Sequence, residues 1–234
     1  MHSLTDSVLS IWGMSEEENH QELIPQSRPS IMKELLGRQR FVLILVVLLV
    51  ELTIFFVATS VPIDAATQQV LRDEAKNLTA ASNSSGPTGL PVQIFTHNAV
   101  IAFGEMVPVV GGLLWVVSIY VTGQISQAVA LSYGAPGLLY GLVLLIFPFA
   151  IVEMAAYAVA VSSGLMLIVA WRRHRLRNET RVLVLEVGAV AAMLLTAAVM
   201  ETVTSVNPVL GIALWIPTGL ATWTLARISV RARN

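Results

Sequence analysis

The chain has 234 residues, of which 55% are hydrophobic and 12% charged, and its formal net charge is −1. A soluble domain usually has about 25% charged residues, so this chain has too little polar surface to face water on all sides. The balanced charge excludes a basic field for nucleic acid. The absence of cysteine excludes disulfides, thiolate metal sites and cysteine nucleophiles.

Residues 1–40 precede the first long apolar run, and we expect them to form a cytoplasmic tail that is partly disordered. The segment is acidic and lacks both a basic start and a continuous apolar core, which argues against a cleaved signal peptide. Ile11, Trp12 and Met14 beside the acidic run suggest a docking peptide, although a flexible tail without a partner is the simpler interpretation.

Apolar runs follow along the rest of the chain, and about 20 such residues are needed to cross a bilayer as a helix. The runs cover residues 41–61, 97–120, 137–147, 149–171, 182–204 and 208–226. The third run is short, and Pro148 separates it from the fourth, so this break must be buried against other helices. The sequence therefore predicts an all-α transmembrane helical bundle over residues 41–228, with about six spans, a proline-broken helix near the third and fourth, and a cytoplasmic tail at 229–234.

Basic residues determine the predicted orientation, because Lys and Arg are enriched in cytoplasmic loops. They form clusters before the first run, between the fourth and fifth runs, and after the sixth: Lys33, Arg38, Arg40; Arg172, Arg173, Arg175, Arg177, Arg181; Arg227, Arg231, Arg233. Six crossings place all three clusters and both ends of the chain in the cytoplasm. Residues 62–94 then form an outer loop, in which we expect a helix near residues 64–81. The sequons Asn77-Leu-Thr79 and Asn83-Ser-Ser85 predict glycosylation at Asn77 and Asn83.

Four glutamates lie within apolar runs: Glu51, Glu105, Glu153 and Glu201. Since no Lys or Arg lies well inside a predicted span, these groups hold a proton, bind a cation or accept hydrogen bonds from polar neighbours. The predicted spans place three of them in the outer half of the membrane, with Glu51 in mid-span. Asn98 shares a helix face with Glu105, and Asn207 lies at an outer turn. We predict a functional polar cluster of Asn98, Glu105, Pro148, Glu153 and Glu201, although each glutamate alone could also be a structural, hydrogen-bonded residue.

Several short motifs in order carry a resemblance to a known family: Phe95-Thr-His-Asn98, Gly111-Gly112, Thr122-Gly123, Phe147-Pro148, Glu153-Met-Ala-Ala-Tyr157 and Ala197-Ala-Val-Met-Glu201. Over residues 95–204 the chain resembles the stage II sporulation protein M family of integral membrane proteins from bacteria and archaea. The resemblance implies that Asn98, Pro148, Glu153 and Glu201 are the family's asparagine, proline and glutamates. Two positions depart from the family pattern, because Phe149-Ala150 stands where its His-Gly follows the proline and Thr122-Gly123 where it has Asn-Gly.

Three functions remain open on the sequence. The resemblance implies a non-enzymatic scaffold or assembly component in envelope or membrane remodelling, with membrane or envelope protein partners, in the cell membrane. The alternative is a permease subunit or small transporter that uses the outer-half glutamates for proton or cation coupling. An intramembrane enzyme is the weakest candidate, because no hydrolase or metal motif is present and no cofactor or metal site is expected. Stripes of small residues in the fourth run (Ala156, Ala160, Gly164) predict close helix packing and would also suit a homodimer.

Overall fold

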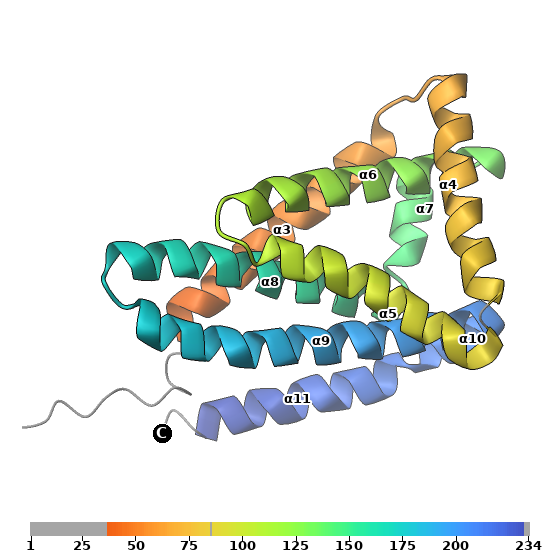
Figure 1. Ribbon diagram of the computed structural model, residues 1–234. Helices are drawn as coiled ribbons and strands as arrows, with labels where there is room; N and C mark the ends of the chain where they lie inside the picture. Colours follow the sequence, from red (N-terminus) through yellow and green to blue (C-terminus); the bar gives the residue numbers. More distant parts are fainter. Residues whose placement is uncertain (1–36, 85, 232–234) are drawn as a thin grey trace, which may run out of the picture. The chain divides into compact units, whose positions relative to one another are not determined.

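The computed structural model describes residues 37–84 and 86–231, and these residues are almost entirely α-helical. Residues 1–36, which include the docking peptide and most of the tail expected at 1–40, lie outside the described part, as do residues 85 and 232–234. The helices, drawn in Figure 1, are α3 (Arg38–Ser60), α4 (Ala65–Ser84), α5 (Gly86–Glu105), α6 (Val110–Ser132), α7 (Gly137–Leu144), α8 (Pro148–Arg172), α9 (Leu176–Val206), α10 (Pro208–Ala213) and α11 (Trp215–Arg231).

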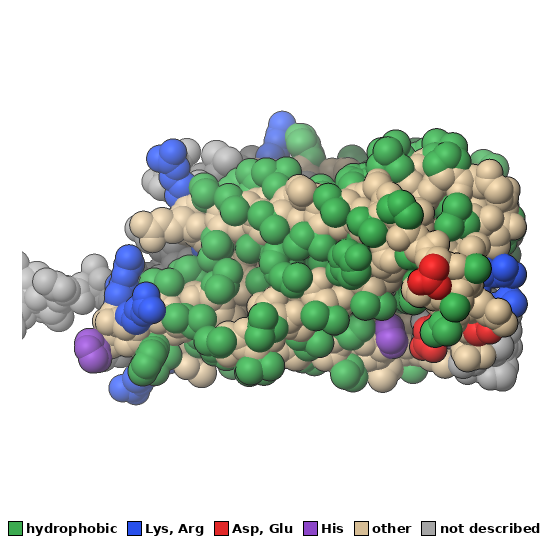
Figure 2. Space-filling view, turned by 90° about the horizontal axis from the view of Figure 1, so that it is seen from above, with side chains coloured by type: hydrophobic (Ala, Val, Ile, Leu, Met, Phe, Trp, Pro, Cys, Tyr) green, Lys and Arg blue, Asp and Glu red, His purple; other side chains and the backbone are tan. Residues whose placement is uncertain are grey.

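Four helices, α3, α6, α8 and α9, are long and apolar enough to cross a membrane. Their large apolar side chains are to a great extent exposed, as on α3, where Phe41, Leu45 and Leu49 each present about half of their surface or more. Figure 2 shows one face of the molecule, on which hydrophobic side chains cover the middle and charged ones lie mostly toward the two ends. The chain is therefore a multi-pass α-helical membrane protein.

The second predicted span, residues 97–120, is wrong, because the chain reverses direction within it. Helix α5 ends at Glu105, and α6 begins at Val110 and runs back beside it (Figure 1). Pro108 has no N–H for the Gly104 carbonyl, which instead accepts from Val107 N at 3.1 Å. Val109 then takes a positive φ of 69° and turns the chain.

For the third predicted run, residues 137–147, a partial span was one of the alternatives, and its helix is too short for a full crossing. Helix α7 has 8 residues, which reach only about 12 Å of the roughly 30 Å hydrocarbon core. The expected break before the fourth run is confirmed: α7 ends at Leu144 and α8 begins with Pro148 in its first turn. Proline suits this position because the first turn of a helix needs no N–H from it.

The segment expected as an outer loop, residues 62–94, is largely helical. The predicted helix near residues 64–81 corresponds to α4, which contacts α5 and α6, and the remainder belongs to the first half of α5. Asn77 is exposed on α4, and Asn83 lies near the end of the same helix. Glycosylation at both sequons, and the side of the membrane on which α4 lies, stay predictions.

Helix α8 lies at the centre of the packing, against α3, α5, α6 and α9. The predicted small-residue stripe is confirmed as a packing face. Ala156 and Ala160 of α8 lie in one cluster with Ala99 and Ala102 of α5 and with Val190 and Leu194 of α9. At Gly164, a Cβ atom would come within 2.9 Å of the Met106 carbonyl oxygen, so a larger residue could not pass the α5–α6 turn here. A second cluster joins Val47 of α3, Trp115 of α6 and Ala158 of α8.

Candidate functional site: carboxylates inside the helical bundle

Glu51 lies on the one face of α3 that is turned into the bundle. This face carries Val47, Glu51, Phe55 and Ala58, which follow one another at intervals of three or four residues and are all buried. Val47 packs with Trp115 and Ala158, and Phe55 with Ile119 and Met154, so Glu51 lies between these two layers of apolar contacts. Its side chain has 0% exposure. The sequence placed Glu51 in mid-span but left it outside the predicted cluster, whereas the structure makes it central.

Both carboxyl oxygens of Glu51 are buried without a hydrogen-bond partner among the described residues. The indole N–H of Trp115 lies near this carboxyl group but does not meet hydrogen-bond geometry with it, and it too has no partner there. The carboxyl groups of Glu105 and Glu153 are close enough for their charges to act on Glu51. Burying a carboxyl group without a hydrogen-bond donor costs free energy of folding, so a glutamate at this position calls for a functional explanation.

Glu105 is the last residue of α5, directly before the turn to α6. It is 1% exposed, and its Oε1 accepts a hydrogen bond from the Ser118 hydroxyl of α6 at 2.8 Å. Its Oε2 is buried without a partner among the described residues. The expectation that Glu105 lies within one continuous span is wrong, because the turn at residues 106–109 puts it at the tip of a hairpin, near Glu51 in the middle of α3.

Glu153 lies in the second turn of α8, just beyond Pro148, which is itself buried. One turn further on, the Tyr157 hydroxyl lies near the Glu153 carboxyl group, and it is also near enough to Glu105 and Glu51 for their charges to act on it. Tyr157 therefore lies among three of the acids. Sequence reasoning quoted this tyrosine only as part of a motif, although its i, i+4 spacing from Glu153 put the two side chains on one helix face.

Glu201 lies in the last two turns of α9, and its charge acts on Glu153. Glu201 therefore extends the group of acids toward the end of the bundle at which α9 ends. Asn98 is buried on α5, two turns before Glu105. Asn207 does not join the group. Its side chain accepts hydrogen bonds from the backbone amides of Val209 and Leu210, at 3.0 and 3.2 Å, and so caps α10.

The acids thus form a series that begins at the middle of α3, continues through Glu105 and Glu153, and ends at Glu201. The charge–charge contacts join groups from four helices, yet no three acidic or histidine side chains among the described residues stand close enough to hold a metal ion. Carboxyl groups that stand apart from one another in this way can each hold and release a proton.

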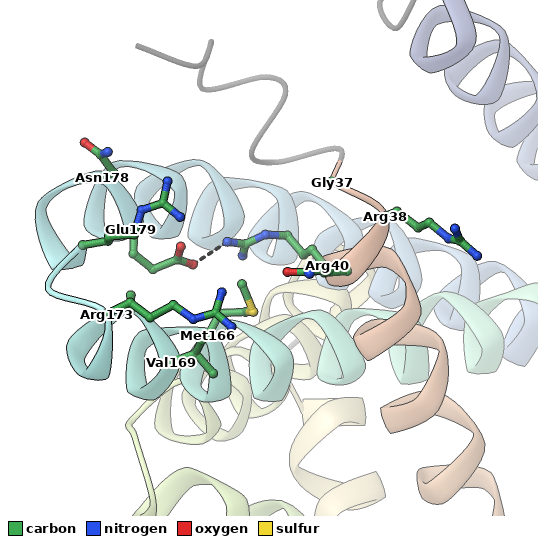
Figure 3. Close-up of a pocket in the computed structure, with 11 residues that line it drawn as sticks. Gly37, Arg38, Arg40, Met166, Val169, Arg173, Asn178 and Glu179 are labelled. Atoms are coloured by element: carbon green, nitrogen blue, oxygen red, sulfur yellow. Dashed lines mark hydrogen bonds and ion pairs between the residues drawn. The ribbon is translucent and has the colours of Figure 1, made fainter. Parts of the chain in front are cut away.

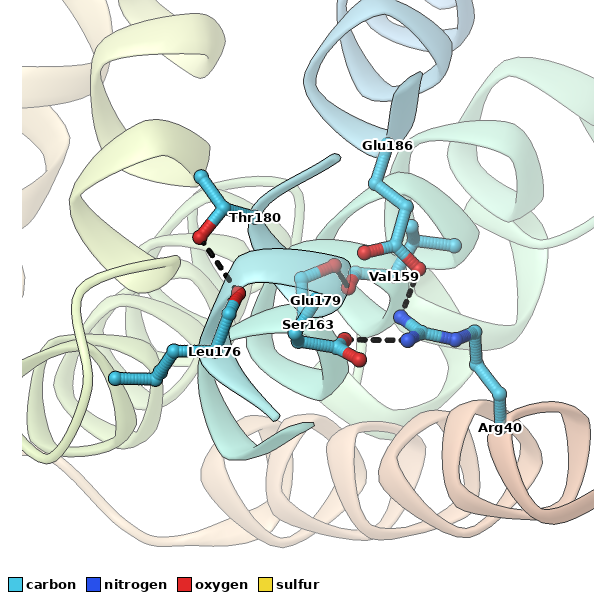
Figure 4. Close-up of polar contacts among 7 residues, drawn as sticks. All are labelled: Arg40, Val159, Ser163, Leu176, Glu179, Thr180 and Glu186. Atoms are coloured by element: carbon cyan, nitrogen blue, oxygen red, sulfur yellow. Dashed lines mark hydrogen bonds and ion pairs between the residues drawn. The ribbon is translucent and has the colours of Figure 1, made fainter. Parts of the chain in front are cut away.

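A second buried polar group was missed by the sequence reasoning. Arg40, in the first turn of α3, is 3% exposed and forms ion pairs with Glu179 and Glu186 of α9 (Figure 4). The sequence analysis used Arg40, which precedes the first predicted span, only as a signal of orientation. Two signals were available: Arg40 directly precedes the apolar run, and Glu179 and Glu186 are seven residues apart, which places them on one face of a helix.

The fold and the buried acids together define a multi-pass membrane protein with ionisable groups inside its helical bundle. Residues 41–206, well over half of the chain, match the stage II sporulation protein M family. The chain belongs to this family, as its motifs indicated. Comparisons with curated proteins and with solved structures give no match.

Proposed function

We propose that the chain is a small transporter or permease subunit in which the interior acids take up and release protons. The observation that carries the proposal is Glu51, whose two oxygens are fully buried without a hydrogen-bond donor among the described residues. An unpaired carboxylate in hydrocarbon is costly, so a group in this position binds a proton and gives it up only when a neighbour accepts it. Glu105, Tyr157 and Glu153 supply such neighbours.

Four crossings, by α3, α8, α9 and α11, fit the predicted orientation with both ends in the cytoplasm. The α5–α6 hairpin turns back near the middle of α3, so it returns to the side from which it entered, and α7 is too short to cross; the count of crossings therefore stays even. The arginines of the α8–α9 loop and of the start of α3 then lie on the cytoplasmic side, where basic residues are favoured, and α4 lies outside. Because the chain has no cysteine, single cysteines introduced at Asn77 and Arg177 report their sides directly. In intact cells, an impermeant maleimide should label Asn77→Cys and spare Arg177→Cys; the reverse labelling contradicts this orientation.

Proton movement is tested with the purified full chain in liposomes that contain a pH-sensitive dye, under a potassium diffusion potential. Wild-type protein should change the internal pH, whereas Glu51→Gln and Glu153→Gln should reduce the change to the level of empty liposomes. Glu74→Gln, which removes an exposed acid on α4, is the matched control and should behave as wild type. Equal proton movement in wild type and both interior variants would refute the proposal, as would wild-type liposomes that behave like empty ones.

The second candidate is a scaffold or assembly component, which the family membership implies and one observation favours. Helix α11 makes only isolated contacts with the other described helices. Its apolar side chains Ile216 and Leu220 are 69% and 61% exposed, a surface that suits a partner helix as well as lipid. Crosslinked co-purification from native membranes would support this role if a specific membrane protein is recovered with wild type but not with Ile216→Ala/Leu220→Ala. Leu138→Ala/Leu139→Ala, on exposed positions of α7, is the control.

A further inference from the structure

A hollow lies at the end of the bundle where α3 begins and where the loop joins α8 to α9 (Figure 3). Its volume is about 330 Å³, and it is lined by Gly37, Arg38, Gln39, Arg40, Met166, Val169, Ala170, Arg173, Arg175, Asn178 and Glu179. We call it the arginine hollow. None of the interior acids Glu51, Glu105, Glu153 and Glu201 lines it.

The lining of the arginine hollow has an apolar part and a basic part. Met166, Val169 and Ala170, from the last turns of α8, give it an apolar wall. Arg38, Arg173 and Arg175 are exposed, and none forms an ion pair with a described residue. An apolar wall beside free guanidinium groups, at the end of membrane-spanning helices, is the arrangement that binds the head group of an anionic lipid.

The buried side chain of Arg40 is a second, independent observation at the hollow. Its side chain is 3% exposed and lines the hollow, and its Nε is buried without a partner among the described residues. Glu179 and Glu186 occupy its two other nitrogens. Buried guanidinium N–H groups are normally satisfied, so this donor points to an acceptor that belongs in the hollow.

The charge balance favours an anion as this acceptor. Arg40 with its two glutamates carries one negative charge, and the unpaired Arg173 and Arg175 add two positive ones, which leaves the site with one positive charge. Helix α3 also starts here without a side-chain cap, so its positive end faces the same region. Arginine is the residue best matched to the geometry of a phosphate group.

We propose that the arginine hollow binds a phosphate group between Arg40 and the exposed arginines Arg173 and Arg175. Two sources share this chemistry: the head group of an anionic phospholipid, whose glycerol and first methylenes would rest on the apolar wall, and a soluble phosphate. The proposal is independent of the proposed function, because proton movement through the interior acids does not involve these residues.

The test uses the full chain, purified in neutral detergent, and measures bound ligand by native mass spectrometry. One arm titrates phosphatidylglycerol against phosphatidylcholine with the same acyl chains, and the other titrates inorganic phosphate. The test variant is Arg173→Gln/Arg175→Gln. The control is Arg172→Gln/Arg177→Gln, which removes the same charge from exposed positions of the same region that do not line the hollow. Thermal unfolding of both variants verifies that they are folded.

Wild type should bind at least one of the two phosphate sources in preference to phosphatidylcholine. The test variant should bind it roughly 30-fold more weakly, since each of two basic residues contributes about 1 kcal/mol, and the control should match wild type. Binding in the lipid arm alone identifies the lipid as the source, and binding in the phosphate arm alone identifies a soluble ligand. Equal loss in both variants would show a general charge effect and overturn the proposal, as would no preference of wild type for either source.

Discussion

Gly111, in the first turn of α6, lies directly against the backbone carbonyl of Glu105, the last residue of α5. A Cβ atom at residue 111 would come within 2.1 Å of the Glu105 carbonyl oxygen. The α5–α6 turn can therefore close only around glycine, and its closure holds the Glu105 carboxyl group near Ser118 and Glu51.

Gly111→Ala should destabilise the protein by about 1–3 kcal/mol, because the backbone of the turn must move to admit the methyl group. The neighbouring Gly112 is the matched control, since a Cβ there meets nothing within 4 Å. Gly112→Ala should be neutral or stabilising by up to about 1 kcal/mol, as expected for alanine in a helix. Thermal unfolding in detergent compares the two; equal melting temperatures would contradict this account of the turn.

Arg40→Met should destabilise the protein by about 3–5 kcal/mol, because it leaves Glu179 and Glu186 buried without their cation. The exposed ion pair of Lys76 and Asp73, at 3.5 Å, is a contrasting case. Lys76→Met should cost less than about 1 kcal/mol. Denaturant unfolding of both variants measures the difference, and a second change, Glu186→Met in the Arg40→Met background, should restore part of the loss. A small effect of Arg40→Met would mean that the buried acids find other partners.

Trp215→Phe should loosen the attachment of α11. The indole N–H of Trp215 donates a 2.6 Å hydrogen bond to the Ile146 carbonyl, one of the carbonyls freed by the break between α7 and α8. The loss of this bond should cost about 0.5–1.5 kcal/mol and raise the rate of proteolytic cleavage after Arg227. Trp171→Phe, at a position 67% exposed, should leave the cleavage rate unchanged. If the two variants are cleaved at the same rate, the bond does not fix α11.

The start of α4 should lose stability in acid. Thr67 donates both its backbone N–H and its hydroxyl to the Asp64 carboxylate, at 2.9 and 2.8 Å, and these bonds lower the pKa of Asp64. The pKa of Asp64 is therefore lower in the folded than in the unfolded chain. The ionised carboxylate stabilises the helix fully at pH values above the unfolded-state pKa, near 3.9, and this stabilisation is lost as the pH falls through the folded-state pKa.

Hydrogen exchange at the Thr67 amide, corrected for the intrinsic effect of pH, measures this contribution. Protection should be high at neutral pH and fall in acid. In Asp64→Ala, protection should be low at both pH values and nearly independent of pH. Unchanged protection in the variant would show that α4 does not depend on this cap.

Much of the fold could be predicted from the sequence, because the length of an apolar run and the position of a proline act directly on the local helix. The run at residues 41–61 and the two at 149–171 and 182–204 became α3, α8 and α9, and the break at Pro148 is where it was predicted. The same reasoning misjudged residues 97–120, where Pro108 was passed over as an interruption within one span. The apolar composition on both sides is equally suited to one helix or to two. The positive φ of Val109 and the close contact of Gly111 with the Glu105 carbonyl distinguish the two cases.

The sequence by itself determined that acids lie within membrane-spanning segments, because each charged residue stands out in an apolar run. Which acids meet was decided by tertiary structure alone. Glu51, on a helix that is apolar on every side, turns inward together with Val47 and Phe55, and the hairpin brings Glu105 to it. Arg40 likewise reaches Glu179 and Glu186 across more than 130 residues of chain. A uniformly apolar helix has no periodicity from which its inner face can be read, so the packing of neighbouring helices chooses that face.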